Sequence, residues 1–171
     1  MPTREPIETT NLDKIYGTDP IPWSRPGELL ADGVLDLATF VGTVRPDGRP
    51  HSARVGMASY DGDLYFQSGP ESRKLRNIAA NPACTVSASL SGIDVVVEGE
   101  AARVTDAATL EAVAGLFREH GWPVEVEGDA LTAPYNAPTA GPPPWHLYRV
   151  TPQTVFGVAT EEPYGATRWR F

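Results

Sequence analysis

Strand-like runs of apolar and β-branched residues, separated by short polar turns, dominate this chain. Ala83–Leu90 alternates apolar and polar residues, and Ile93–Val104 (IDVVVEGEAARV) continues the alternation after a Ser91-Gly92 turn. Leu35–Val44 and Trp145–Ala159 have the same strand-type composition. A period of two is typical of half-buried β-strands, so the pattern predicts a mainly β protein.

Two Asp-Gly turns divide the region between Leu37 and Phe66. Arg45-Pro46-Asp47-Gly48 places a proline where φ is fixed near −65° and a glycine where φ is positive, which predicts a hairpin joining Leu37–Val44 to Arg49–Ser59. Tyr60-Asp61-Gly62-Asp63 repeats the arrangement before Leu64-Tyr65-Phe66. Consecutive hairpins of this kind favour antiparallel pairing.

Three segments are expected to be short helices. Trp23–Ala31 begins at a Ser24 cap, and Ser72 to about Ala80 ends at Asn81-Pro82 because the residue before a proline disfavours the α region. Asp106–His120 has a capping aspartate and apolar residues at helical spacing. About six mostly antiparallel strands with these helices predict a mainly β, α+β fold built on a closed or partly closed barrel.

Proline and glycine positions suggest the domain organisation. Residues 1–22 contain four prolines and few apolar groups, so we expect an extended N-terminal arm. Residues 23–171 are expected to form one domain, interrupted by a proline-rich loop at 122–144.

Composition and charge exclude several classes of function. The chain has 171 residues, a net charge of −8 and a pI near 4.8, so neither nucleic acid nor an anionic membrane is an expected partner. It has no apolar run of the ~20 residues that span a membrane and no apolar signal-peptide core, so we expect a cytoplasmic protein. Its single cysteine, Cys84, is expected to be a small core residue.

Positive charge gathers in one part of this acidic chain. Between positions 45 and 76 there are six of the fourteen Lys and Arg residues against four acidic residues. Cations near a helix N-terminus oppose the helix dipole and do not stabilise the helix. Their position is better explained by a bound anion. We expect backbone amides, the Ser68 and Ser72 hydroxyls and Lys74 to bind that anion; a solvated basic face is the alternative.

No set of residues predicts a catalyst supplied by the protein itself. His51, His120 and His146 have no metal-ligand spacing, and the chain has no nucleophile elbow, Walker loop or dinucleotide fingerprint. The sequence therefore assigns neither a catalytic residue nor a metal ligand. If the protein is an enzyme, a bound organic cofactor must supply the reactivity.

An ordered set of motifs resembles a known family. RPDGRPH between two strands, then DG, LYF, SGP, S and KLRN, a strand DVVVEGEA and the chain end TRWRF are similar to the flavin and deazaflavin oxidoreductases of the pyridoxamine 5′-phosphate oxidase-like split barrel. The likeness covers about residues 35–104 and the final strand. It implies an FMN-binding split β-barrel of antiparallel Greek-key type, and a homodimer that binds FMN or coenzyme F420 at the subunit interface.

The resemblance also implies roles for individual residues. One strand would run beneath the cofactor ring, the helix start would hold the cofactor phosphate with two supporting residues, and the chain end would reach the same pocket across the dimer. The strand residues are Arg54, Val55, Gly56 and Met57. The phosphate-binding residues are Ser68, Ser72, Arg73 and Lys74, with Arg76 and Asn77 as the supporting residues. The residues of the chain end are Trp169 and Arg170.

The implied function is F420-dependent transfer of hydride to an unsaturated or quinone-like small molecule. An FMN-dependent oxidase or reductase of the same fold is the alternative, and a non-enzymatic cofactor or haem carrier, with His51 or His146 as axial ligand, is a third. Gly56-Met57 and TRWRF differ from the pyridoxamine 5′-phosphate oxidase motifs, so we do not expect pyridoxine phosphate as substrate.

Overall fold

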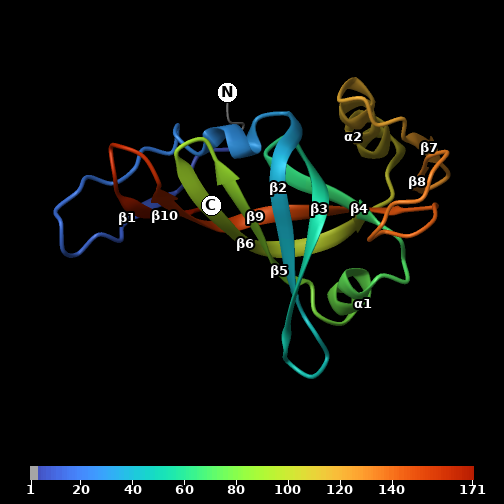
Figure 1. Ribbon diagram of the computed structural model, residues 1–171, viewed down its shortest axis with the longest axis horizontal. Helices are drawn as coiled ribbons and strands as arrows, with labels where there is room; N and C mark the ends of the chain where they lie inside the picture. Colours follow the sequence, from blue (N-terminus) through green and yellow to red (C-terminus); the bar gives the residue numbers. More distant parts are fainter. Residues whose placement is uncertain (1–3) are drawn as a thin grey trace.

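The computed structural model describes residues 4–171, which form a six-stranded barrel with one sheet edge extended beyond it (Figure 1). The elements are β1 Glu8–Asn11, the 3₁₀ turn η1 Gly27–Leu30, β2 Gly33–Val44, β3 Pro50–Tyr60, β4 Asp63–Ser68, α1 Arg73–Ala80, β5 Ala83–Leu90, β6 Ile93–Val104, α2 Ala107–Glu119, β7 Glu125–Glu127, β8 Ala130–Thr132, β9 His146–Ala159 and β10 Ala166–Arg170.

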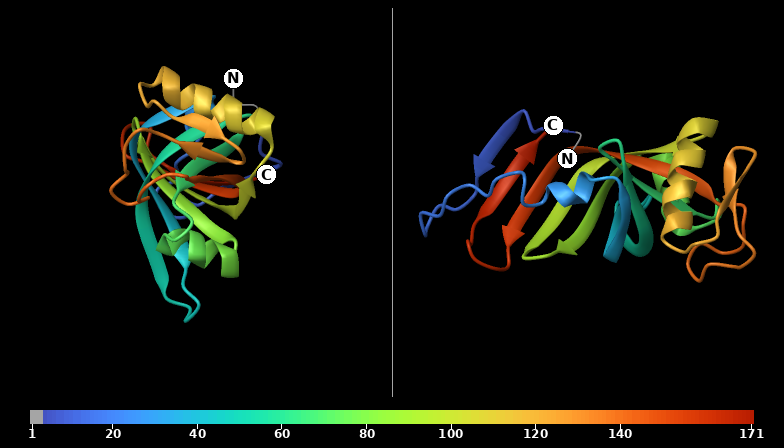
Figure 2. Two further views of the ribbon diagram at one scale, coloured as in Figure 1. Left: turned by 90° about the vertical axis from the view of Figure 1, so that its right-hand side faces the viewer. Right: turned by 90° about the horizontal axis from the view of Figure 1, so that it is seen from above.

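Antiparallel pairing closes the barrel. The strand order is β9-β4-β3-β2-β5-β6, and β6 pairs back with β9. The far half of β9 pairs with β10, and β10 pairs with β1. Figure 2 shows the result: β1 and β10 lie at one end of the molecule, and α2 with the β7–β8 hairpin lies at the other. The predicted mainly β, split-barrel fold is confirmed.

The barrel interior is one of two hydrophobic cores. Alternate residues of β6, including Ile93, Val95 and Val97, point inward with Val41, Val86 and Trp169. Cys84 belongs to this core as predicted, and burial raises the pKa of its thiol to about 12. The second core lies where α2 packs outside the barrel: Leu110, Val113 and Phe117 meet Tyr65, Trp145 and Leu147. The candidate site lies beside this second core.

Turns and caps agree with the sequence for simple stereochemical reasons. Gly48 has φ +84°, and Asp61 and Gly62 have φ +49° and +78°, as tight hairpin turns require. Asp106 caps α2, and its carboxylate accepts a 2.8 Å hydrogen bond from the Thr109 amide. These short-range features depend on few neighbours, so the sequence alone predicts them.

Three expectations need correction. Trp23–Ala31 is not a helix beyond the single turn η1, where Leu29 N donates to Pro26 O in the short i to i+3 pattern. The 122–144 loop contains the β7–β8 hairpin, whose three-residue strands are too short to give a sequence signal. Within the N-terminal arm, Glu8–Asn11 is extended but belongs to the main sheet through β10. No helix among residues 4–171 is long and apolar enough to cross a membrane.

Candidate functional site

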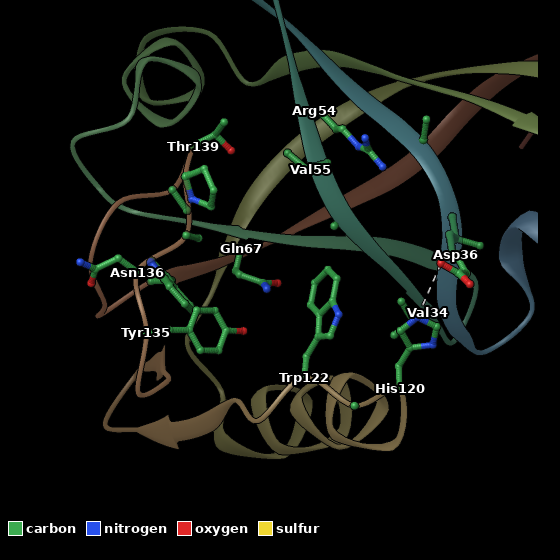
Figure 3. Close-up of a pocket in the computed structure, with 18 of the residues that line it drawn as sticks. Val34, Asp36, Arg54, Val55, Gln67, His120, Trp122, Tyr135, Asn136 and Thr139 are labelled. Atoms are coloured by element: carbon green, nitrogen blue, oxygen red, sulfur yellow. Dashed lines mark ion pairs between the residues drawn. The ribbon is translucent and has the colours of Figure 1, made fainter.

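A cavity of about 790 Å³ opens between the barrel wall and the elements that cover it (Figure 3). One side consists of residues 34–38 of β2 and 54–56 of β3; the other consists of residues 120–123 after α2 and 135–140 of the proline-rich loop. Gln67 and Lys74 also line the cavity, and its inner end is defined as the part beside buried Lys74. Its volume falls within the ~300–1,000 Å³ typical of sites for small molecules and cofactors.

An irregularity in β2 shapes the floor of this cavity. Leu35 pairs with Met57 and Thr39 with Val55, so β2 has two more residues than β3 between the same two rungs. In the described chain Gly56 therefore has no register partner on β2, and the three residues Asp36 to Ala38 that lie opposite it form part of the cavity wall. Bulges of this kind redirect side chains and free backbone groups beside functional sites.

Gly56 also permits a close aromatic contact. A methyl group at this position would overlap the six-membered ring of Trp122, so the indole lies directly on the glycine backbone. The same indole stacks on Phe117 of α2, with the ring planes 3° apart. Trp122 is thereby fixed as a wall of the cavity, across from Tyr135 in Figure 3.

Lys74 brings a buried positive charge to the inner end of the cavity. Its side chain is 3% exposed, and its Nζ donates to Thr139 O at 3.3 Å. None of the carboxylates that the structure describes pairs with it, and burial alone lowers the pKa of its amine. A buried ammonium is costly without a counter-charge, so this group is suited to an anionic ligand.

The start of α1 adds further donors at the same place. Ser72 is the N-cap in extended conformation, but its side chain makes no capping hydrogen bond to the helix. The hydroxyl of buried Ser68 instead donates to Ser72 Oγ at 3.1 Å. The first-turn amides of α1 therefore have no side-chain cap, which is the usual preparation of a helix N-terminus for an anion.

The proline-rich loop is attached over this inner end. The Gly69 amide donates to Ala140 O at 3.0 Å, and a methyl group at Gly69 would overlap that same oxygen. Together with the bond from Lys74 to Thr139, this contact holds residues 139–140 against β4 and α1. The loop therefore covers Lys74, and glycine is needed at position 69 for it to do so.

Amine labelling tests this arrangement, since Lys14 and Lys74 are the only lysines of the chain. We expect an amine-reactive reagent to modify exposed Lys14 at once and buried Lys74 at least about tenfold more slowly, because burial keeps the reagent from the Lys74 amine even though its lowered pKa favours the reactive neutral form. Gly69→Ala should displace the loop and accelerate labelling of Lys74 without changing Lys14, as measured by peptide mass spectrometry. Equal labelling rates at Lys74 in the wild type and in Gly69→Ala would contradict the role of Gly69 in holding the loop over Lys74.

The structure brings together only part of the predicted site. Arg54, Val55, Gly56 and Lys74 line the cavity, and Ser68 and Ser72 adjoin Lys74. Met57 does not line it, and its side chain is fully buried in the barrel core. The remaining residues lie outside the lining: Arg73 and Arg76 are exposed on α1, and Asn77 is buried, its Nδ2 donating to Thr43 Oγ1 at 2.9 Å.

The two predicted residues of the chain end point in opposite directions. Trp169 is 0% exposed and packs edge to face on Trp23, with ring centroids 5.4 Å apart, inside the core of its own chain. The interpretation of Trp169 as a group reaching a partner's pocket is therefore wrong. Arg170 lies on the outer side of β10 and pairs with Glu8 at 3.1 Å, where its own chain does not bring it to the cavity.

Several cavity residues gave no usable sequence signal. Gln67 at the end of β4 has a buried Oε1 without a hydrogen-bond partner among the described residues. Tyr135 and Trp122 come from the segment predicted as a loop. His120, at the C-cap of α2, lies with Nε2 3.8 Å from Asp36 Oδ1 at the cavity edge. Only folding places these separate segments together.

Comparisons with known proteins agree with the fold. A family model described as "Pyridoxamine 5'-phosphate oxidase" matches residues 36–159. The pyridoxine/pyridoxamine 5′-phosphate oxidase of Bacteroides thetaiotaomicron is 39% identical over 71 residues, which make up 40% of this chain and 33% of that enzyme. The match thus spans about a third of that relative's length.

Two solved structures give similar folds at low identity. An F420 reductase is 24% identical with a TM-score of 0.52, over 75% of this chain and 94% of its own. A pyridoxamine 5′-phosphate oxidase-related, FMN binding protein from Nostoc punctiforme is 18% identical with a TM-score of 0.52, over 86% of this chain and 84% of its own. At these identities the likeness concerns the fold.

Proposed function

The chain belongs to the pyridoxamine 5′-phosphate oxidase family, and on this premise we propose that it is an oxidoreductase using coenzyme F420. The acceptor in this proposal is an unsaturated or quinone-like small molecule. The fold is the flavin-binding split barrel of that family. An F420 reductase among the structural neighbours supports the choice of the deazaflavin.

Buried Lys74 is the observation that carries this proposal. An ammonium that is 3% exposed, with only a carbonyl as partner, is stabilised when a phosphate comes within hydrogen-bond distance. Ser68, Ser72 and the uncapped amides of α1 supply further donors to the same anion. The residues at the inner end of the cavity therefore fit the phosphate of either cofactor.

The remainder of the cavity fits a planar ring. Val55 and Gly56 provide a flat strand surface, and Trp122 and Tyr135 provide aromatic walls. The unpartnered Oε1 of Gln67 is available to an N–H donor of the ligand. The cofactor, when bound, supplies hydride chemistry, while these residues orient its ring, hold its phosphate and exclude water from the acceptor.

FMN is the second candidate because an FMN-binding protein has the same fold. The donors at the inner end of the cavity also fit the FMN phosphate as well as they fit that of F420. A haem carrier is not favoured: neither His51 nor His146 lines the cavity. Absorbance separates the two main candidates. Protein purified with FMN is yellow with oxidised-flavin bands, whereas the deazaflavin has to be added.

We further propose that the protein is a homodimer joined through the outer face of the barrel. Phe40, Val96 and Val158 are exposed there, and a single row of paired residues runs from Arg54 through Phe40 and Ser87 to Val96. Because Arg54 also lines the cavity, a partner on this face would border the cofactor site. Exposed apolar side chains on one face favour such a contact.

Thermal unfolding with each cofactor added separately tests the proposed function. A ligand at 100 times its dissociation constant stabilises the folded state by ~2.7 kcal/mol, which raises the midpoint by about 5–11 °C for a domain of this size. We expect such a shift with F420, and hydride transfer from reduced F420 to a quinone. A shift with FMN but not with F420 would assign FMN as the cofactor. No shift with either cofactor would overturn the proposal.

A further inference from the structure

A group of unpartnered basic atoms lies beyond the cavity, next to the turn of the β2–β3 hairpin. Nδ1 of His51 and Nε of Arg45 are both buried, and neither has a hydrogen-bond partner among the described residues. Buried polar atoms without partners are uncommon in folded proteins. Because no described residue pairs with these two atoms of one hairpin, both are available to a ligand group.

Helix α1 packs on this hairpin and connects it to the proposed phosphate site. Asn77 of α1 donates to Thr43 Oγ1, and Thr43 is the β2 residue paired with His51. Figure 1 shows α1 beside the lower part of the hairpin. Thus the helix whose second residue is Lys74 also packs beside the strand pair that contains His51.

The charges acting on His51 are all positive. They come from Arg45 at the end of β2 and from Lys74 and Arg73 of α1; together with burial, they lower the pKa of the His51 imidazole. No carboxylate of residues 4–171 offsets them: Asp47 of the same hairpin is paired with Arg49 at 3.1 Å. The imidazole is therefore neutral at pH 7 while the site holds no anion.

We propose that Arg45 and His51 form a second anion-binding position beside Lys74. This position binds the second negative charge of a cofactor tail, and the His51 imidazole takes up a proton when that charge binds. This inference rests on the proposed function and adds to it the class of tail: an anion with at least two negative charges. A phosphate monoester, as in FMN, supplies both on one group. The acidic tail of F420 supplies the second on a carboxylate.

The direction of the coupling follows from electrostatics. An anion close to a histidine favours the imidazolium, and a neighbouring opposite charge shifts a pKa by about 1–3 units. Binding therefore takes up a proton at pH values between the lowered value of the free protein and the raised value of the complex. Affinity for the dianion increases as the pH falls through that window.

Nuclear magnetic resonance of the His51 ring tests this inference directly. The His51 imidazole signal, assigned with His51→Gln, is followed against pH for the protein alone and with inorganic phosphate, FMN, F420 or riboflavin. We expect the midpoint to rise by about 1–3 pH units with FMN or F420, to rise with phosphate, and to stay constant with riboflavin. His146, whose pKa burial and Arg103 also lower, is the internal control and should not respond.

Comparison of the titrations with different ligands distinguishes failure of this inference from failure of the proposed function. If FMN or F420 binds and the His51 midpoint does not move, the second position is wrong and the cofactor assignment stands. If phosphate raises the midpoint but neither cofactor binds, the anion position stands and the proposed function fails. If no anion moves the midpoint, the inference is overturned.

Arg45→Gln gives a second test that keeps the histidine. Removing one repelling cation should raise the His51 midpoint of the free protein and reduce the additional rise that FMN causes. In calorimetry, the proton uptake on FMN binding, measured in buffers of different ionisation enthalpy, should be smaller in Arg45→Gln than in the wild type. Equal uptake in both proteins would contradict a role for Arg45.

Discussion

Replacing Trp169 by alanine should lower the free energy of unfolding by about 3–5 kcal/mol, the usual cost of removing a large buried aromatic side chain. Its indole fills the end of the barrel core against Trp23, and glycine at position 157 leaves space for the ring. Chemical denaturation monitored by circular dichroism measures the change. An alanine at Arg170, on the outer side of the same strand, is the matched control and should cost less than about 1 kcal/mol.

Cofactor affinity then separates a core role of Trp169 from a binding role. Trp169→Phe keeps an aromatic ring in the core, so the protein should stay folded and bind cofactor with unchanged affinity. A tenfold or greater loss of affinity in a folded Trp169→Phe protein would show that the residue acts on the pocket, against the buried position seen here.

The second large effect is expected at Lys74. Replacement by methionine removes a charge-assisted hydrogen bond to the cofactor phosphate, worth about 1.5–3 kcal/mol, and should weaken binding about 10- to 150-fold. Isothermal titration calorimetry measures this loss. Arg76→Met, an exposed residue of the same helix, changes the net charge equally and should reduce affinity less than about threefold.

Without cofactor the same Lys74→Met substitution should stabilise the protein. The wild type buries an ammonium that no carboxylate compensates, whereas methionine fills the same space without that cost. Because burial lowers the lysine pKa in the folded state, the cost is greatest below that lowered pKa and decreases as the pH rises from it toward the ordinary value of 10.5. A Lys74→Met protein that unfolds at a lower temperature than the wild type, with tight cofactor binding retained, would contradict this account.

Of these two predicted site residues, Lys74 lines the cavity and Trp169 does not. The basic residues near Lys74 follow a strand and a turn directly, so proximity in the chain is proximity in space. Trp169 was assigned through a resemblance of the chain end as a whole. Alternation along β10 sends neighbouring side chains to opposite faces, so Trp169 enters the core and Arg170 faces outward.

The β2 bulge opposite Gly56 is another feature that the sequence did not predict. The sequence identified Arg54 to Met57 as one strand beneath a ring, yet the β2 bulge opens the ladder at Gly56 and only Arg54, Val55 and Gly56 reach the cavity. A bulge depends on how two strands match in length and register. Neither strand specifies that match by itself.

The sequence by itself determined the mainly β fold, the hairpin turns, the α1 and α2 helices and the gathering of positive charge near α1. Each of these follows from residues within one or two turns of one another. Tertiary structure alone decided that Trp122 lies on Gly56, that the loop covers Lys74, that Gln67 and His120 border the same cavity and that three cations lower the pKa of His51. Those relations join segments distant in the chain, and they arise only when closure of the barrel fixes the strand register.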